Sequence, residues 1–325
     1  MHGVSPLGNK APAVIFDPMK KLKLVFMGTP EFAVPMLETL VNSEHEVVGV
    51  ITAPDKPAGR GMQVTESEVK KYAVSKGLHI LQPEKLKNEN FLAQLKALHA
   101  DLFVVVAFRM LPEIVWSMPP LGCINLHASL LPQYRGAAPI NWAIINGEKE
   151  TGVTTFFIQQ EIDTGKIIFQ ESIPVREDEN AGELYAELMK LGAGVLLKTV
   201  NAIADHNYPQ IEQDFVSTLK PAPKIFKNDC KIDWNKDVRS VYNFIRGLSP
   251  YPAAFTLLDG KVFKIYKASH KTWQQPAHVT GTYQTDGKNF LRFACADGWL
   301  DIEECQLEGK KKMSAKEFLI GFKAA

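Results

Sequence analysis

Short hydrophobic runs alternate with segments of helical periodicity along the first 200 residues. Runs at 22–27, 46–52, 102–107 and 122–127 predict buried strands. Hydrophobic residues spaced three and four apart predict helices between them, as in 91–98, and a long helix at 183–200. Such alternation predicts an α/β fold with a mainly parallel sheet. We therefore expect polar residues after the strands, including Asp55 and His127, to gather beyond the carboxyl edge of the sheet.

Local signals predict where several helices begin. Thr29 precedes Pro30 and is expected to cap the first helix. Thr65 and Glu68 have the spacing of a capping box, and so do Ser314 and Glu317 near the end of the chain.

The pattern changes after a polar, proline-bearing stretch at 206–224. One helix is predicted at 238–248, followed by short strands near Ala254, Val262, Val279, Leu291 and Leu300. Asp-Gly pairs at 259–260, 286–287 and 297–298 predict turns between them. This spacing is typical of a small, OB-like β-barrel. We expect an extension at 1–20, a catalytic domain at 21–207, a linker at 208–225 and a barrel domain at 226–325.

Composition narrows the class of protein only a little. Hydrophobic residues make up 46% of the 325-residue chain and charged residues 22%, which is ordinary for a globular protein. Four scattered cysteines without a C-x-x-C pair favour a reducing, cytoplasmic setting over a disulfide framework or a zinc site. No apolar run reaches the ~20 residues of a membrane span, and the histidines are not clustered as metal ligands. We expect no membrane partner and no metal.

The strongest chemical signal lies at the end of the predicted strand 122–127. Asn125 and His127 are two residues apart, so their side chains face the same side of a strand. An amide N–H can stabilise an oxyanion, and an imidazole can exchange protons near neutral pH. Asp163, in the sequence Glu-Ile-Asp-Thr-Gly, is a candidate carboxylate to orient the imidazole. Taken alone this spacing is weak evidence, because an Asn-x-His pair on a strand is more often structural.

The longer sequence around these residues resembles the folate-dependent formyltransferase family. The match covers Asn125 to Ile140 and Glu161 to Gly165, and related segments run from about Leu24 to the C-terminus. The resemblance implies a Rossmann-like doubly wound N-terminal domain, the formyl donor 10-formyltetrahydrofolate, and Asn125, His127 and Asp163 as the catalytic trio. It implies folate binding by Phe108, Arg109, Met110, Ser129, Leu130, Leu131 and Pro132. The chain departs from the family at Gln159, Glu161 and Ile162, where we expect altered local packing with activity retained.

Two further resemblances indicate the acceptor. The segment 54–61 is similar to the loop with which some family members contact the acceptor end of the initiator tRNA, and segments 231–234 and 246–253 resemble the start of their barrel domain. The implied tRNA-binding residues are Lys56, Arg60, Lys261 and Lys264.

The implied reaction gives N-formylmethionyl-tRNA for translation initiation, with methionine-charged initiator tRNA as the partner, and we expect a monomer. Two alternatives stay open. One is a formyltransferase acting on a small-molecule amine such as an amino sugar nucleotide, and the other is a non-catalytic nucleotide- or RNA-binding module. The absence of a G-x-G-x-x-G fingerprint and of a Walker A lysine weighs against the second.

Overall fold

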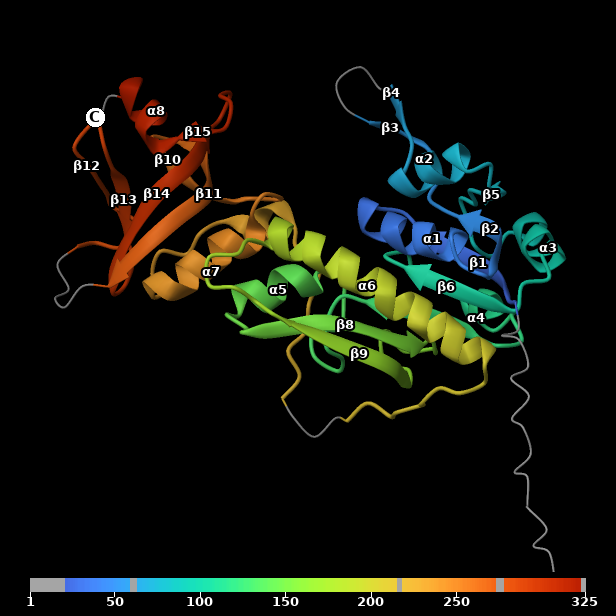
Figure 1. The fold of residues 1–325 in the computed structure, drawn as a ribbon. Helices are drawn as coiled ribbons and strands as arrows, with labels where there is room; N and C mark the ends of the chain where they lie inside the picture. Colours follow the sequence, from blue (N-terminus) through green and yellow to red (C-terminus); the bar gives the residue numbers. More distant parts are fainter. Residues whose placement is uncertain (1–20, 59–62, 215–217, 273–277, 323–325) are drawn as a thin grey trace, which may run out of the picture.

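The computed structural model describes residues 21–58, 63–214, 218–272 and 278–322. The N-terminal part is built on a seven-stranded sheet (Figure 1). Its strand order is β5 (Ile80–Leu81), β2 (Glu46–Ile51), β1 (Lys23–Gly28), β6 (Leu102–Val106), β7 (Cys123–His127), β8 (Glu150–Phe157) and β9 (Ile167–Pro174). The strands from β5 to β7 are parallel, whereas β8 and β9 are antiparallel to their neighbours. The predicted α/β fold is confirmed, with two antiparallel strands added at one edge.

Alternation along the strands explains why helices cover both faces of this sheet. In β1, Leu24 and Phe26 pack with α1 (Val34–Val41), α2 (Glu68–Ser75) and α6 (Ala181–Ala204). Val25 and Met27 point to the opposite face, where α3 (Glu89–Ala97) and α4 (Glu113–Trp116) lie. Because successive side chains of a strand point to opposite faces, a continuously apolar strand needs such a cover on both sides.

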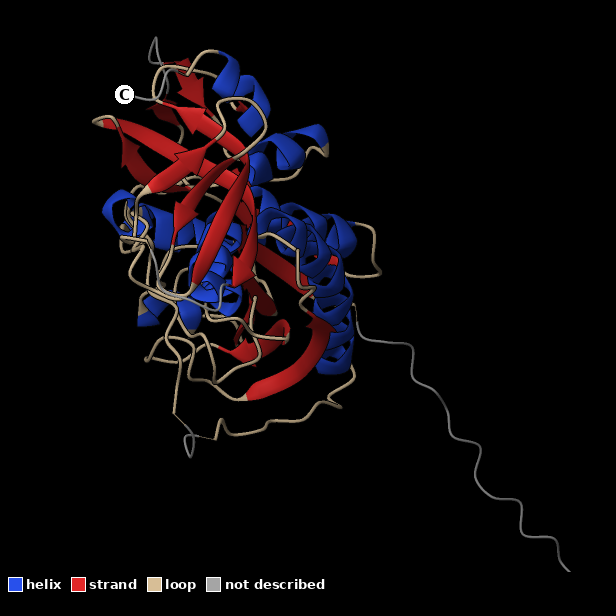
Figure 2. Cartoon of the chain, turned by 90° about the vertical axis from the view of Figure 1, so that its left-hand side faces the viewer, coloured by secondary structure: helices blue, strands red, loops and turns tan. Residues whose placement is uncertain are grey.

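The C-terminal part is an antiparallel, barrel-like sheet packed against helices (Figure 2). Its order is β10 (Ala254–Leu258), β11 (Lys261–Thr272), β14 (Gly298–Leu307), β13 (Leu291–Ala294) and β12 (Tyr283–Thr285), with β15 (Met313–Ser314) beside β14. Its core lies between these strands, α7 (Val238–Leu248) and α8 (Ala315–Ile320). The helix α7 was predicted with the same bounds, and the capping box of Ser314 and Glu317 is confirmed.

Three local predictions are wrong. The first helical turn, η1 (Glu31–Ala33), follows Pro30 and has no side-chain cap, so Thr29 lies one residue too early. The cap of α2 is Ser67, whose Oγ accepts from Lys70 N at 3.1 Å.

Thr65 instead pairs in the small hairpin of β3 (Lys56–Ala58) and β4 (Gln63–Thr65), which removes it from the helix start. Val279 is exposed, and its carbonyl accepts from Thr282 N in a turn, so the strand expected there begins later, at Tyr283.

Candidate active site

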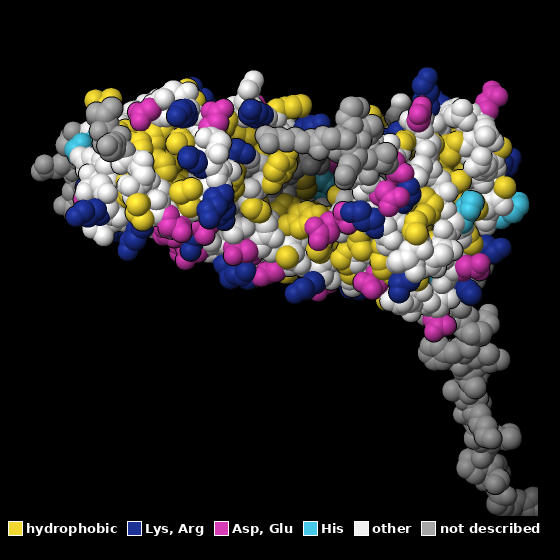
Figure 3. Space-filling model, turned by 90° about the horizontal axis from the view of Figure 1, so that it is seen from above, with side chains coloured by type: hydrophobic (Ala, Val, Ile, Leu, Met, Phe, Trp, Pro, Cys, Tyr) yellow, Lys and Arg dark blue, Asp and Glu magenta, His cyan; other side chains and the backbone are white. Residues whose placement is uncertain are grey.

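A cavity of about 1010 Å³ lies between the two parts of the molecule. Its walls come from the carboxyl ends of β6 and β7, from α5 (Pro139–Ile145), from the start of α6, and from residues 249–251 of the C-terminal part. Figure 3 shows a face that is hollowed between the C-terminal domain on the left and the sheet domain on the right, with hydrophobic side chains around the hollow. A volume of this size accommodates a ligand larger than most drug-sized molecules.

Asn125 and His127 both line this cavity from β7. His127 is buried, with 7% of its surface exposed, and Asn125 is half-buried. Within the described part of the chain, the Asn125 side-chain amide makes no hydrogen bond. Its N–H groups therefore remain available to an oxygen atom of a bound ligand.

The imidazole of His127 lies between a carbonyl and a carboxylate. Nε2 is 2.8 Å from the Tyr134 carbonyl oxygen, and Nδ1 is 3.8 Å from Asp163 Oδ2. A carbonyl can only accept, so Nε2 carries the hydrogen in this arrangement and Nδ1 faces Asp163. At 3.8 Å the second contact is an ion-pair distance and too long for a hydrogen bond.

Asp163 is held by the backbone and by a residue from the segment expected to be a linker. Its Oδ2 accepts from Gly136 N at 3.0 Å. Gln213 Nε2 donates to Asp163 O at 2.9 Å and to Gly165 O at 2.8 Å, while Gln213 Oε1 accepts from Arg135. Gln213 is 4% exposed. It is a positioning residue that sequence reasoning missed, because an isolated Gln in a polar stretch carries no signal.

The expected linker contacts the site elsewhere as well. Tyr134 N donates to Lys220 O at 2.7 Å, and Ala137 N donates to Ala222 O at 2.8 Å. Ala222 is fully buried. The segment therefore packs against the loop that carries the His127 partner, in addition to connecting two domains.

The residues expected to bind folate fall into two groups. Phe108, Arg109 and Met110 line the cavity. Ser129, Leu130, Leu131 and Pro132 are not among its lining residues, and their binding to folate stays a prediction. Hydrogen bonds explain why they are not in the lining: Thr154 Oγ1 donates to Ser129 O at 2.6 Å and accepts from Leu131 N at 3.1 Å, which holds this turn against β8.

The departures from the family pattern are also in the wall. Gln159, Glu161 and Ile162 all line the cavity. Gln159 Nε2 donates to Thr164 Oγ1 at 2.7 Å, and Thr164 Oγ1 donates to Glu161 O at 3.0 Å. These contacts close the turn that presents Asp163.

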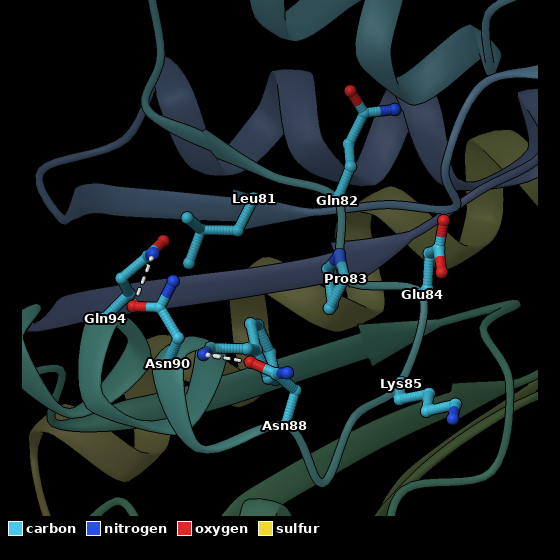
Figure 4. Close-up of a pocket in the computed structure, with 9 residues that line it drawn as sticks. Leu81, Gln82, Pro83, Glu84, Lys85, Asn88, Asn90 and Gln94 are labelled. Atoms are coloured by element: carbon cyan, nitrogen blue, oxygen red, sulfur yellow. Dashed lines mark hydrogen bonds between the residues drawn. The ribbon is translucent and has the colours of Figure 1, made fainter.

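A second, polar pocket of about 490 Å³ lies beside the first (Figure 4). Arg109 connects the two, because its guanidinium donates to Glu84 O at 2.8 Å and to Pro83 O, and both residues line the polar pocket. Burial lowers the pKa of this guanidinium from its ordinary value. Asp55 follows β2 at the carboxyl edge of the sheet, as expected, but is not among the residues that line the cavity. It pairs with Lys70 and Gln82, and the Lys70 hydrogen bond lowers its pKa.

The residues expected to contact tRNA are dispersed. Lys56 is exposed on β3, and Arg60 lies outside the described residues. Lys261 and Lys264 lie on β11, and Lys264 Nζ is 3.5 Å from the Pro252 carbonyl oxygen, next to the cavity residues 249–251. In the described part of the chain no three His, Cys, Asp or Glu side chains form a metal-binding group. No helix of that part is long and apolar enough to cross a membrane.

Comparison with known proteins defines the class. Residues 21–200 match the model of the formyl transferase family, and residues 224–323 match the model of the formyl transferase C-terminal domain. The chain belongs to the formyl transferase family.

Curated relatives that cover almost the whole chain share one particular name. The methionyl-tRNA formyltransferase of Bacteroides thetaiotaomicron is 53% identical over 315 residues, which is 94% of this chain and 98% of the relative. That of Parabacteroides distasonis is 54% identical over 317 residues, with coverage of 94% and 98%. That of Flavobacterium johnsoniae is 50% identical over 307 residues, with coverage of 93% and 97%.

Solved structures share the fold at lower identity. HypX from Aquifex aeolicus, solved in complex with tetrahydrofolic acid, has a TM-score of 0.61 at 17% identity and covers 92% of this chain and 47% of its own. WlaRD, a sugar 3N-formyl transferase solved with dTDP and 5-N-formyl-THF, has a TM-score of 0.62 at 22% identity, with coverage of 89% and 99%.

Proposed function

We propose that this chain transfers the formyl group of 10-formyltetrahydrofolate to the α-amino group of methionyl-tRNA, giving N-formylmethionyl-tRNA for translation initiation. The observation that carries the proposal is the identity of 50–54% to methionyl-tRNA formyltransferases along 93–94% of the chain. A cavity lined by Asn125, His127 and Asp163 supplies groups suited to acyl transfer. Relatives of the same fold bound to folates support a folate donor.

The first step is attack of the amine on the formyl carbon. A free α-amino group has a pKa of about 7.7–8.0, so it must lose a proton before its lone pair can attack. The new C–N bond converts the formyl carbonyl into a tetrahedral oxyanion. The unpaired amide of Asn125 donates to that oxygen, which lowers the barrier because the donor is in place before charge develops.

The second step breaks the bond between the formyl carbon and the folate nitrogen N10. The proton lost before the attack goes to solvent. The attacking nitrogen loses a second proton as it becomes the amide and N10 gains that one, so the reaction of the neutral amine is balanced without another reactant. His127 carries this proton on Nδ1, which makes no hydrogen bond at 3.8 Å from Asp163, while Nε2 keeps its donation to the Tyr134 carbonyl. Asp163 and the Tyr134 carbonyl stabilise the charged ring, and we expect the 3.8 Å contact to shorten when substrates fill the cavity.

The partner proposed here is methionine-charged initiator tRNA, and we propose a monomer acting in the cytoplasm. The four cysteines are free and buried, as expected of a protein from a reducing compartment. Sedimentation in the presence and absence of tRNA tests the oligomeric state.

The decisive experiment mixes the protein with 10-formyltetrahydrofolate and methionine-charged initiator tRNA and measures formylmethionine after deacylation. Charged elongator methionine tRNA is the control. Formylation of the initiator alone supports the proposal. No formylation of either tRNA, with folate still bound, would indicate a small-molecule acceptor instead. In the same assay Arg60→Ala should lower kcat/KM for tRNA and leave the KM for folate unchanged. An equal loss of folate affinity would overturn its assignment to tRNA.

A further inference from the structure

A large aromatic side chain stands almost uncovered at the wall of the active-site cavity. Tyr251 lines the cavity with Ser249 and Pro250, yet 83% of its surface is exposed. These residues belong to the loop between α7 and β10, so they come from the C-terminal domain. The catalytic side chains come from the N-terminal domain. Tyr251 therefore lines the same cavity as Asn125 and His127 but comes from the other domain.

The loop beneath this ring is firmly held. Gly182 N, at the start of α6, donates to Ser249 O at 3.1 Å, and Ala253 N donates to Leu248 O at 2.9 Å. Ser249 is 4% exposed and Ala253 is 2% exposed. A ring carried by a fixed backbone loses little conformational freedom when a ligand covers it, so its contact area translates efficiently into binding.

A cation lies next to the same loop. Lys264 Nζ is 3.5 Å from the carbonyl of Pro252, the residue after Tyr251. Its side chain is part-exposed on β11. An exposed aromatic face beside a lysine is the combination with which proteins bind single-stranded nucleic acid, because the ring stacks on a base and the cation contacts the phosphate.

We propose that Tyr251 stacks on the base of the 3′-terminal nucleotide of the aminoacylated tRNA and thereby fixes the ester from which the amine reaches Asn125 and His127. This inference rests on the proposed function and names a residue that positions its substrate. The aminoacyl group must enter the cavity while its nucleotide stays at the mouth, where the ring stands. Stacking needs an aromatic face and does not need the phenol hydroxyl. Lys264 contacts the adjoining phosphate.

Kinetics of three variants test the proposal. Tyr251→Ala should lower kcat/KM for methionine-charged tRNA by about 5- to 150-fold, the range covered by loss of one base–aromatic stack. Tyr251→Phe should stay within about twofold of wild type, because it keeps the ring. Leu257→Ala, at a side chain 53% exposed in the same domain, is the matched control and should have no effect. The KM for 10-formyltetrahydrofolate should not change in any of them.

A binding measurement separates stacking from other causes. The tRNA carries 2-aminopurine in place of its terminal adenine, and no folate is added. Its fluorescence should be quenched on binding to wild type and to Tyr251→Phe, and the quenching should be lost with Tyr251→Ala. Thermal unfolding curves confirm that the variants fold.

The possible failures are distinct. Equal kcat/KM for wild type and Tyr251→Ala overturns the stacking proposal while leaving the reaction intact. A Tyr251→Phe variant as impaired as Tyr251→Ala overturns it too, because the hydroxyl would then be the active group. A wild-type protein that formylates no charged tRNA contradicts the proposed function itself.

Discussion

At the scale of single residues, the polar groups of the site differ in how many partners they have. Asn125 has no hydrogen-bond partner among the described residues, whereas His127 has a neighbour at each ring nitrogen. A half-buried amide is reached by water, so the lack of a protein partner costs little stability. Asn125 is therefore the residue whose removal should affect catalysis most and folding least.

We expect Asn125→Ala to lower kcat by about 10²–10³-fold, the usual cost of one oxyanion donor. The free energy of unfolding should change little. Single-turnover formylation and chemical denaturation measure the two quantities. Asn90→Ala, in the polar pocket, is the control and should leave kcat unchanged. If Asn125→Ala and His127→Ala both kept near-full activity, the catalytic assignment would be wrong.

Gln213 acts on the reaction through Asp163. A Gln213→Glu variant keeps the shape but cannot donate to the two backbone carbonyls of the Asp163 turn. We expect kcat to fall by about 10- to 100-fold with the KM values nearly unchanged, because a displacement of about 1 Å can cost that much. The pH–rate profile should also shift, since the contact between Asp163 and His127 changes. Gln94→Glu, on the exposed side of α3, is the matched control, and an unaltered profile in Gln213→Glu would refute the positioning role.

At the scale of elements, α6 belongs to the N-terminal domain and its first turn contacts the C-terminal domain (Figure 1). The middle of α6 packs on the sheet, and its first turn contacts the loop of Ser249 and Pro250, where Gly182 N donates to Ser249 O. Two of its glycines have opposite surroundings. A Cβ on Gly182 would lie 2.6 Å from Pro250 Cδ, whereas one on Gly194 would meet nothing within 4 Å.

We expect Gly194→Ala to raise the free energy of unfolding by about 0.5–1 kcal/mol, because alanine loses less backbone entropy in a helix. Gly182→Ala should lower it, since Pro250 must move. Gly182→Ala should also reduce kcat/KM for charged tRNA, because the displaced loop carries Tyr251. Denaturant titration measures the change in the free energy of unfolding for each variant. An equal gain at the two positions would contradict the packing described.

At the scale of the whole molecule, buried polar contacts join the domains. Arg246, from α7, is 5% exposed, and its Nη1 donates to Glu179 O at 2.9 Å and to Arg176 O at 3.3 Å. On the same interface, Asn141 Nδ2 donates to Gly247 O at 2.7 Å. These contacts hold together the two domains that line the cavity.

Arg246→Ala should cost about 1–3 kcal/mol, because it leaves the buried Glu179 carbonyl without this donor. We expect calorimetry of Arg246→Ala to resolve two unfolding transitions that lie further apart in temperature than in wild type. The kcat/KM for charged tRNA should also fall. Arg239 lies on the same helix as Arg246 and forms an exposed ion pair with Glu177. Arg239→Ala removes this pair and should have little effect. A single unshifted transition in Arg246→Ala would show that this arginine does not couple the domains.

Hydrophobic periodicity determined the elements that are long and locally specified. The helix α7, the strand β7 and the α/β class were predicted because their apolar positions repeat with one period over several residues. The family was also recognisable from sequence, because Asn125 and Asp163 each lie in a short motif whose residues follow one another along the chain. Helix starts were predicted less well, because Ser67 and Thr65 offer similar caps and strand pairing removes the second.

Tertiary structure alone decided the contacts between distant parts of the chain. Nothing in a polar stretch indicated that Gln213 would be buried against Asp163, 50 residues away. Nothing in the segment 129–132 indicated that hydrogen bonds to Thr154 would hold it out of the cavity wall. Nor did sequence place Tyr251 in the same cavity as Asn125. Local sequence sets propensity and periodicity, whereas side-chain partners depend on which surfaces the folded chain brings together.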